Sequence, residues 1–209
     1  MANTNAAFGL RPYNLVGSAT NSTGYTRYAI QTVAVAGTTS SLFTGQVVIP
    51  LSTGLIDAAG NANGGTVPLL GVFMGCEYID LDGKPRFSQS YPGRAAVLAD
   101  SDSFAYVSDD PNQIYEINCD AAAALTIVFN NANLATGVTG TASTGLSLGE
   151  LAVSTAAATA NLNLRIIGFS DKPNGDDATV AGRLALVRLN NHFNAPAGGD
   201  TDYIGSIGI

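Results

Sequence analysis

Short stretches in which apolar and polar residues alternate run through much of this chain, and they constrain its fold more than any other feature. From residue 43 to residue 49, Phe43, Gly45, Val47 and Ile49 alternate with Thr44, Gln46 and Val48. The same period of two recurs at residues 115–119 and 161–166. Because successive side chains of a strand point to opposite faces of a sheet, this period predicts strands with one face in a core.

Two further runs are more fully apolar, at residues 69–73 and, apart from Arg188, at residues 184–189, and they predict strands that are covered on both faces. Segments rich in Gly, Pro, Asn and Asp separate the runs, at residues 61–65, 82–85, 91–93, 109–111 and 173–176. Helical patterns are scarce, so any helix is expected to be short. The sequence therefore predicts a mainly β fold, an antiparallel β-sandwich or a jelly-roll-like barrel.

The two ends of the chain differ from the middle. Residues 1–23 and 194–209 contain apolar side chains at irregular spacing among Asn, Gly, Pro and Ala. We expect an extended N-terminal arm over 1–23, a β core domain over 24–193 and an extended C-terminal arm over 194–209. Apolar arms are poorly solvated when free, so each should lie against the core or a neighbouring subunit, and deletion of residues 1–20 should leave the core folded.

Charged residues are few and unevenly spread. Asp, Glu, Lys and Arg make up 12% of the chain, against roughly 25% in ordinary globular domains. Asp57 is the only one of these between Arg27 and Glu77, and Glu150 is the only one from residue 121 to residue 164. Since charged groups are depleted at interface cores, this composition favours a component of an assembly, and the second stretch is the better candidate for a subunit-facing surface. The alternative is a Thr- and Ser-coated β domain that acts alone.

The net charge of −7 argues against nucleic acid as a partner, because phosphate binding requires clustered Lys and Arg. No stretch is apolar for the roughly 20 residues that a membrane span needs, and the N-terminus lacks the pattern of a secretory signal. We therefore expect synthesis in a cytoplasm and no membrane partner. In that reducing compartment Cys76 and Cys119 are expected to be buried thiols, although they could in principle pair.

Candidate catalytic groups are sparse. His192 is the only histidine, and no pattern marks a nucleophile that it could serve, so a structural or interface role is expected. Four acidic pairs fall in turns, where Asp commonly binds its own backbone: Asp80 with Asp82, Asp100 with Asp102, Asp109 with Asp110, and Asp176 with Asp177. Two Cys and one His cannot make a zinc site, and no phosphate-binding loop occurs. The sequence thus predicts no enzyme activity, no catalytic residues, no cofactor and no metal, although a loop that binds a divalent ion or a glycan stays open.

Several segments together resemble small structural proteins of tailed-bacteriophage heads. They are residues 5–12 (NAAFGLRP), 70–73 (LGVF), 75–78 (GCEY), 109–111 (DDP), 165–169 (RIIGF) and 187–190 (VRLN). The likeness spans most of the chain, and within this group it points to decoration, or cement, proteins.

The resemblance implies a virion protein that binds the outside of the capsid shell, bridges neighbouring capsomers and stabilises the head. The implied partners are the major capsid protein and further copies of the chain, as a homotrimer. The residues expected to make contacts lie in the two arms: Phe8, Leu10, Arg11, Tyr13, Tyr203, Ile204 and Ile207. Two alternatives remain: another virion component, such as a tail, fibre or minor shell protein, and a carbohydrate-binding β-sandwich.

Overall fold

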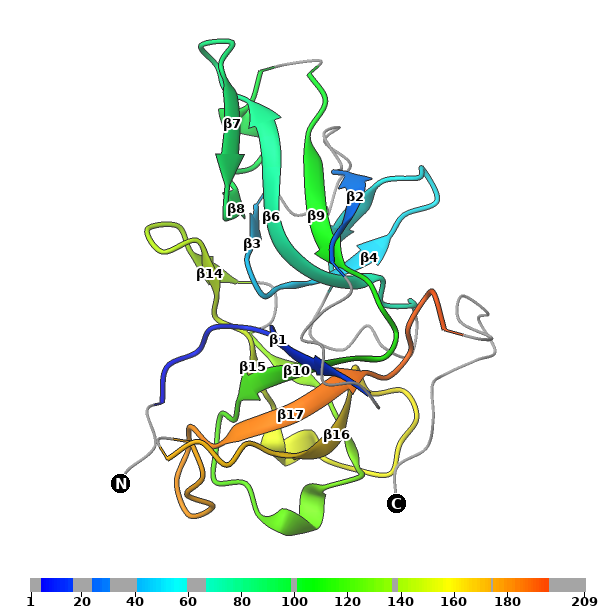
Figure 1. Cartoon of the computed structure of the whole chain (residues 1–209), viewed down its shortest axis with the longest axis vertical. Coiled ribbons are helices and arrows are strands. Elements are labelled where there is room, and N and C mark those ends of the chain that lie inside the picture. Colours follow the sequence, from blue (N-terminus) through cyan, green and yellow to red (C-terminus); the bar gives the residue numbers. More distant parts are fainter. Residues whose placement is uncertain are drawn as a thin grey trace.

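The computed structural model describes residues 5–16, 24–30, 41–59, 67–98, 101–136, 139–173 and 175–195. These residues form a mainly β fold whose strands are arranged in two principal antiparallel sheets, as the alternating pattern predicted. Helical structure within them is limited to three 3-10 turns, η2 (Arg94–Ala96), η3 (Leu125–Ile127) and η4 (Val153–Thr155). Figure 1 shows the two sheets one above the other along the long axis of the molecule.

The lower sheet has five strands in the order β1 (Arg11–Leu15), β10 (Gln113–Asn118), β17 (Leu184–Leu189), β16 (Leu164–Phe169) and β11 (Asn131–Ala132). The upper sheet has the order β2 (Thr26–Ala29), β9 (Phe104–Ser108), β6 (Gly71–Ile79), β4 (Val47–Pro50) and β5 (Ile56–Ala58), with β7 (Pro85–Ser88) also paired to β6. Three small ladders complete the fold: β3 (Leu42–Phe43) with β8 (Ser90–Tyr91), β12 (Leu134–Ala135) with β15 (Glu150–Leu151), and β13 (Gly140–Thr141) with β14 (Leu146–Ser147).

Each principal sheet has its own hydrophobic core, and β4 and β6 contribute to both. Val47 and Val72 belong to the lower core, while their neighbours Val48 and Phe73 belong to the upper one. All four side chains are at most 1% exposed. The apolar run at 69–73 is therefore covered on both faces because it lies between two cores, as its composition predicted.

The upper sheet curls around its core. Ile30, directly after β2, forms a parallel bridge with Ile56 at the start of β5, so the two ends of the sheet meet. Ile30 and Ile56 are 3% and 1% exposed and pack inside this curl with Phe73 and Val107. Within the described residues a single bridge joins the ends, where a closed barrel would have a ladder of hydrogen bonds.

One predicted strand is interrupted. The alternation over residues 43–49 suggested continuous pairing, but β3 ends at Phe43 and β4 begins at Val47. Between them Gly45 has a φ of 88°, and a Cβ on it would lie 2.7 Å from the Phe8 carbonyl oxygen. The chain turns here because the segment before β1 crosses at backbone contact distance, with the Leu10 amide donating to the Gly45 carbonyl at 2.8 Å. Only glycine tolerates both the φ and the crossing.

The N-terminal segment is part of the core domain where it is described. β1 pairs with β10 at the edge of the lower sheet, with Arg11 opposite Glu116. Leu10 is 1% exposed and belongs to the lower core. Residues 10–15 therefore lie against the core, as expected for the N-terminal arm, and supply a core side chain and an edge strand. Residues 196–209 of the expected C-terminal arm lie outside the described residues.

Candidate interaction surfaces

The N-terminal residues expected to contact partners divide into buried and exposed ones. Leu10, one of the residues expected to make contacts, is enclosed in the lower core and is 1% exposed. Phe8 is half-buried, with the Arg11 guanidinium 4.6 Å from its ring centroid. Tyr13 is 38% exposed and lies beside the Lys172 ammonium. Phe8, Arg11 and Tyr13 thus reach the surface on or just before β1, whereas the other three candidates, Tyr203, Ile204 and Ile207, lie outside the described residues.

A buried carboxylate holds this N-terminal segment in place. Glu116 in β10 is fully buried and forms ion pairs with Arg11 and with Lys172, the latter at 2.7 Å. Burial opposes ionisation of Glu116, but hydrogen bonds from Lys172 and Arg11 outweigh it and lower the pKa of the carboxyl group. Since the two cationic side chains are about half exposed, they cover Glu116 from the solvent side. We call Glu116, Arg11 and Lys172 the ion triad. It holds β1 and the loop that contains Lys172 against β10 of the lower sheet.

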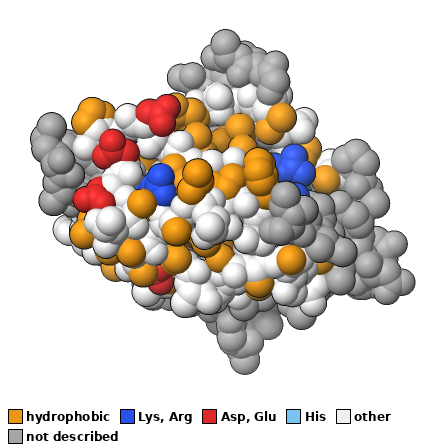
Figure 2. Space-filling view, turned by 90° about the horizontal axis from the view of Figure 1, so that it is seen from below, with side chains coloured by type: hydrophobic (Ala, Val, Ile, Leu, Met, Phe, Trp, Pro, Cys, Tyr) orange, Lys and Arg blue, Asp and Glu red, His pale blue; other side chains and the backbone are white. Residues whose placement is uncertain are grey.

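The lower end of the molecule, at the bottom of Figure 1, is formed by a loop that carries no charge. Residues 121–130 contain no acidic or basic side chain, and most of them are exposed. Leu125 is 71% exposed and Phe129 is 53% exposed, while Ile127 and Val128 pack against the lower core. Figure 2 views this end and shows apolar side chains across the middle of the face, with most of the visible acidic groups along one side. We call residues 121–130 the apolar loop.

The apolar loop is firmly anchored. Ala123 is fully buried, and its carbonyl accepts a hydrogen bond from Arg183, whose guanidinium also stacks 3.6 Å from the Phe169 ring centroid. The Phe129 amide donates to the Ile166 carbonyl at 2.9 Å. Leu125 and Phe129 are therefore presented to solvent by a fixed backbone.

Phe129 also carries backbone strain. Its φ is 70°, in the left-handed region that bulky residues rarely occupy. Such a conformation costs on the order of 1–3 kcal/mol and persists only where the surroundings impose it. Because Phe129 is 53% exposed, packing inside the chain does not account for Phe at this strained position, which makes Phe129 a candidate contact residue.

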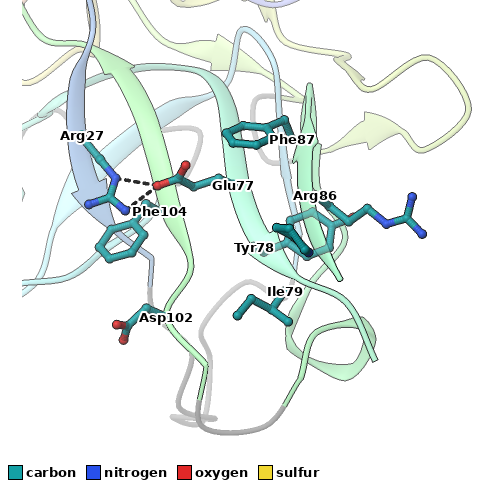
Figure 3. Close-up of a pocket in the computed structure, with 9 residues that line it drawn as sticks. Arg27, Glu77, Tyr78, Ile79, Arg86, Phe87, Asp102 and Phe104 are labelled. Carbon is teal, nitrogen blue, oxygen red and sulfur yellow. Dashed lines mark hydrogen bonds and ion pairs between the residues drawn. The ribbon is translucent and has the colours of Figure 1, made fainter. Parts of the chain in front are cut away.

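A cleft of about 260 Å³ lies at the opposite end, on the outer face of the upper sheet. Its central row crosses three strands, because Glu77 in β6 is paired with Phe104 in β9 on one side and with Phe87 in β7 on the other. Figure 3 shows Glu77 between the two rings, with Arg27 reaching over Phe104 and Asp102 below it.

Polar contacts fix the cleft's floor. Arg27 Nε donates to Glu77 at 2.6 Å, and the Tyr106 hydroxyl donates to the other carboxylate oxygen at 3.0 Å. These contacts, above all the hydrogen bond from Arg27, lower the pKa of Glu77. The Arg27 guanidinium lies 3.3 Å from the Phe104 ring centroid. By contrast, the Phe87 ring is 76% exposed.

His192 lies where the chain leaves β17 and contacts the base of the upper sheet. It is 1% exposed, and its Nδ1 accepts a hydrogen bond from the Asn194 amide at 3.1 Å. The residues beside it, Asn191 and Phe193, exchange backbone hydrogen bonds with Leu69 at 2.8 Å. Burial lowers the pKa of His192 to about 4, so it is neutral at pH 7.

In three of the four acidic pairs one residue binds nearby backbone amides, as the sequence context predicted, whereas Asp109 accepts hydrogen bonds from the Thr26 and Tyr28 hydroxyls. Asp80 accepts hydrogen bonds from the amides of Asp82 and Lys84, Asp110 from Asn112, and Asp177 from Thr179. Asp100 lies outside the described residues. Within the described residues, no three His, Cys, Asp or Glu side chains come together as a metal-binding group.

Cys76 and Cys119 are both buried free thiols, which confirms that prediction, and burial raises the pKa of each to about 12. Among the residues that the structure describes, no helix has the length and apolar character to cross a membrane. Comparison with protein-family models, with curated proteins and with solved structures returns no significant match.

Proposed function

We propose that this chain is a structural protein of a tailed-bacteriophage head, a decoration protein that binds the outside of the capsid shell, bridges capsomers and stabilises the head. The observation that carries the proposal is the apolar loop, which is anchored, uncharged and turns Leu125 and Phe129 outward. In this proposal the loop meets the major capsid protein, the chain works as a homotrimer in the virion, and it has no enzymatic role.

Adhesion of this kind depends on apolar area. Burying one large apolar side chain contributes about 1.5–3 kcal/mol, so Leu125 and Phe129 supply a useful share of the energy of a single contact. Three copies of the apolar loop on one trimer bind shell sites jointly, which raises the overall affinity well above that of one contact. The ion triad at Glu116 holds a different part of the lower sheet, so the apolar loop is available for the shell.

Cosedimentation with expanded capsid shells that lack this protein tests the proposal. Leu125→Gln should raise the dissociation constant at least about tenfold, because it places a polar amide in an apolar contact. The matched control is Leu81→Gln, since Leu81 is 64% exposed in the β6–β7 turn at the other end. Wild-type protein that stays in the supernatant, or a Leu125→Gln protein that binds as well as wild type, would overturn the proposal.

The oligomeric state is checked separately. Light scattering of the purified protein should give three times the chain mass of 21.3 kDa. The Leu125→Gln protein should keep that mass, since the proposal assigns the apolar loop to the shell. Location of the protein's density in an intact particle separates a decoration protein from a tail, fibre or minor shell component.

A further inference from the structure

The cleft on the upper sheet, between Phe104 and Phe87, has the features of a ligand site at the end of the molecule farthest from the apolar loop. We propose that it binds a neutral sugar, one pyranose ring of an oligosaccharide, with its apolar face on Phe87 and its hydroxyls on Arg27, Glu77 and Asp102. This binding function is separate from attachment to a shell and does not depend on it.

The width of the cleft suits a single ring. Phe104 and Phe87 flank Glu77 on neighbouring strands, so their backbones are two strand spacings apart, about 10 Å. Because the Arg27 guanidinium covers the Phe104 ring, a sugar ring would lie between Arg27 on that side and Phe87 on the other, with contacts of about 3.5–4.0 Å. The volume of about 260 Å³ is just below the roughly 300–1,000 Å³ of sites for drug-sized ligands. One saccharide unit fits, and the rest of a glycan would extend into solvent.

The charge of the lining favours a neutral ligand. Its charged residues are Arg27, Arg86, Glu77 and Asp102, but Arg86 pairs with Asp80 outside the cleft, so the other three leave a formal charge of only −1 on the described lining. Arg27 is paired with Glu77, and Arg86 is paired with Asp80 and points away from the cleft in Figure 3. Within the described lining a phosphate would find both arginines already paired, and a cationic group would find only the carboxylate of Asp102, whose oxygens can also accept hydrogen bonds from sugar hydroxyls.

The mixture of aromatic walls and polar floor distinguishes a sugar from an apolar peptide. An apolar side chain would cover the Arg27–Glu77 pair without offering a hydrogen bond, and burying polar groups in that way is unfavourable. Sugar hydroxyls donate to carboxylate oxygens and accept from guanidinium N–H groups. Arg27 has five N–H donors, of which Glu77 engages those on Nε and Nη2, and its side chain is half exposed.

The floor is already in place before any ligand arrives. Glu77 is held from one side by Arg27 and by Tyr106, and Arg27 in turn rests on Phe104. Because these groups are ordered by the sheet, binding would not have to pay for arranging them, which favours affinity at a small site. Phe87 is the exposed wall, and its ring offers the apolar surface for the ligand.

An array of neutral oligosaccharides built from glucose, galactose, mannose and their N-acetyl derivatives tests the proposal, with sialylated and sulfated glycans as the charged arm. The wild-type protein should bind at least one neutral glycan, and it should bind no sialylated or sulfated glycan in preference to the neutral ones. Phe87→Ala should weaken that binding at least tenfold in calorimetry. Leu81→Ala, which removes a similarly exposed side chain from the same hairpin outside the cleft, should change it less than twofold.

Three results would overturn the proposal: no neutral glycan bound, binding restricted to charged glycans, or Phe87→Ala binding as tightly as wild type. Phe87 is 76% exposed, so its removal should leave the fold intact, and an unchanged circular dichroism spectrum checks this. Shell cosedimentation of the Phe87→Ala protein should equal that of wild type, so the two proposals can fail independently.

Discussion

The strain at Phe129 makes a specific prediction about replacing it with glycine and with alanine. In regular elements glycine is less stable than alanine by about 0.5–1 kcal/mol, because it loses more backbone freedom on folding. At a φ of 70° the order should reverse, since a Cβ in the left-handed region costs about 1–2 kcal/mol. Both variants lose the same aromatic ring, so its packing cancels in the comparison. We expect Phe129→Gly to be more stable than Phe129→Ala by roughly 0.5–1 kcal/mol.

Urea denaturation followed by far-ultraviolet circular dichroism measures this difference, provided that the two variants have the same m-value. The same pair of substitutions at Leu125 is the control, because Leu125 lies in η3 and has no positive φ. There alanine should be the more stable residue by about 0.5–1 kcal/mol. Equal stability of the two Phe129 variants, or a more stable alanine variant, would refute the strain at this position.

Three other residues give predictions about stability. Leu10→Ala should lower the free energy of unfolding, measured by chemical denaturation, by about 2–5 kcal/mol, because it leaves a cavity in the lower core. A loss below about 1 kcal/mol would contradict the packing of Leu10 in that core. Glu116→Gln should lower the free energy of unfolding by about 1–2 kcal/mol at pH 7. Because the pKa of the Glu116 carboxyl group is lowered in the folded protein, this difference in stability from wild type should shrink as the pH falls through that pKa. His192 has a folded pKa of about 4 against 6.5 for an ordinary histidine, so the unfolded chain takes up a proton first. Stability should therefore fall by about 3 kcal/mol between pH 6.5 and pH 4, and the His192→Gln protein should lack that part of the pH dependence.

The sequence pattern was most informative where a strand is covered in the way its composition suggests. The run at 69–73 leads into β6 and is buried on both faces between the two cores. The run at 184–189 becomes β17 in the middle of the lower sheet, but only Ala185, Val187 and Leu189 are buried, so the cover expected on both faces is incomplete. The pattern located both strands, but it did not show that Leu184 and Leu186 are paired with Asn118 and Glu116, which give the second face of β17 polar neighbours.

Prediction failed where a distant segment covers a polar face. Glu116 and Asn118 alternate with core residues, which suggests a solvent-facing side, yet both are fully buried. The covering groups are Arg11, Lys172 and Asn5, which lie far away in the chain. A period of two shows which residues share a face, but it does not show what lies on that face.

The candidate ligand site could not be found from the sequence for a related reason. Phe87 and Phe104 come from different strands and flank Glu77 only because of the register of β7 and β9 against β6. The charge-poor stretch from residue 121 to residue 164 contains the apolar loop, but its composition does not single out residues 121–130. The exposure of Leu125 and Phe129 could be found only from the structure, because Ile127 and Val128 in the same loop are equally apolar but pack against the lower core.

The absence of charge from the apolar loop has a consequence for the conditions under which it can hold a partner. Contacts between exposed ions weaken as salt screens them, with a Debye length of about 8 Å at physiological ionic strength. Contacts made by Leu125 and Phe129 have no such dependence, and they gain strength on warming from low temperature because apolar burial is driven by entropy there. A particle held together in this way would tolerate large changes in salinity and would loosen first in the cold.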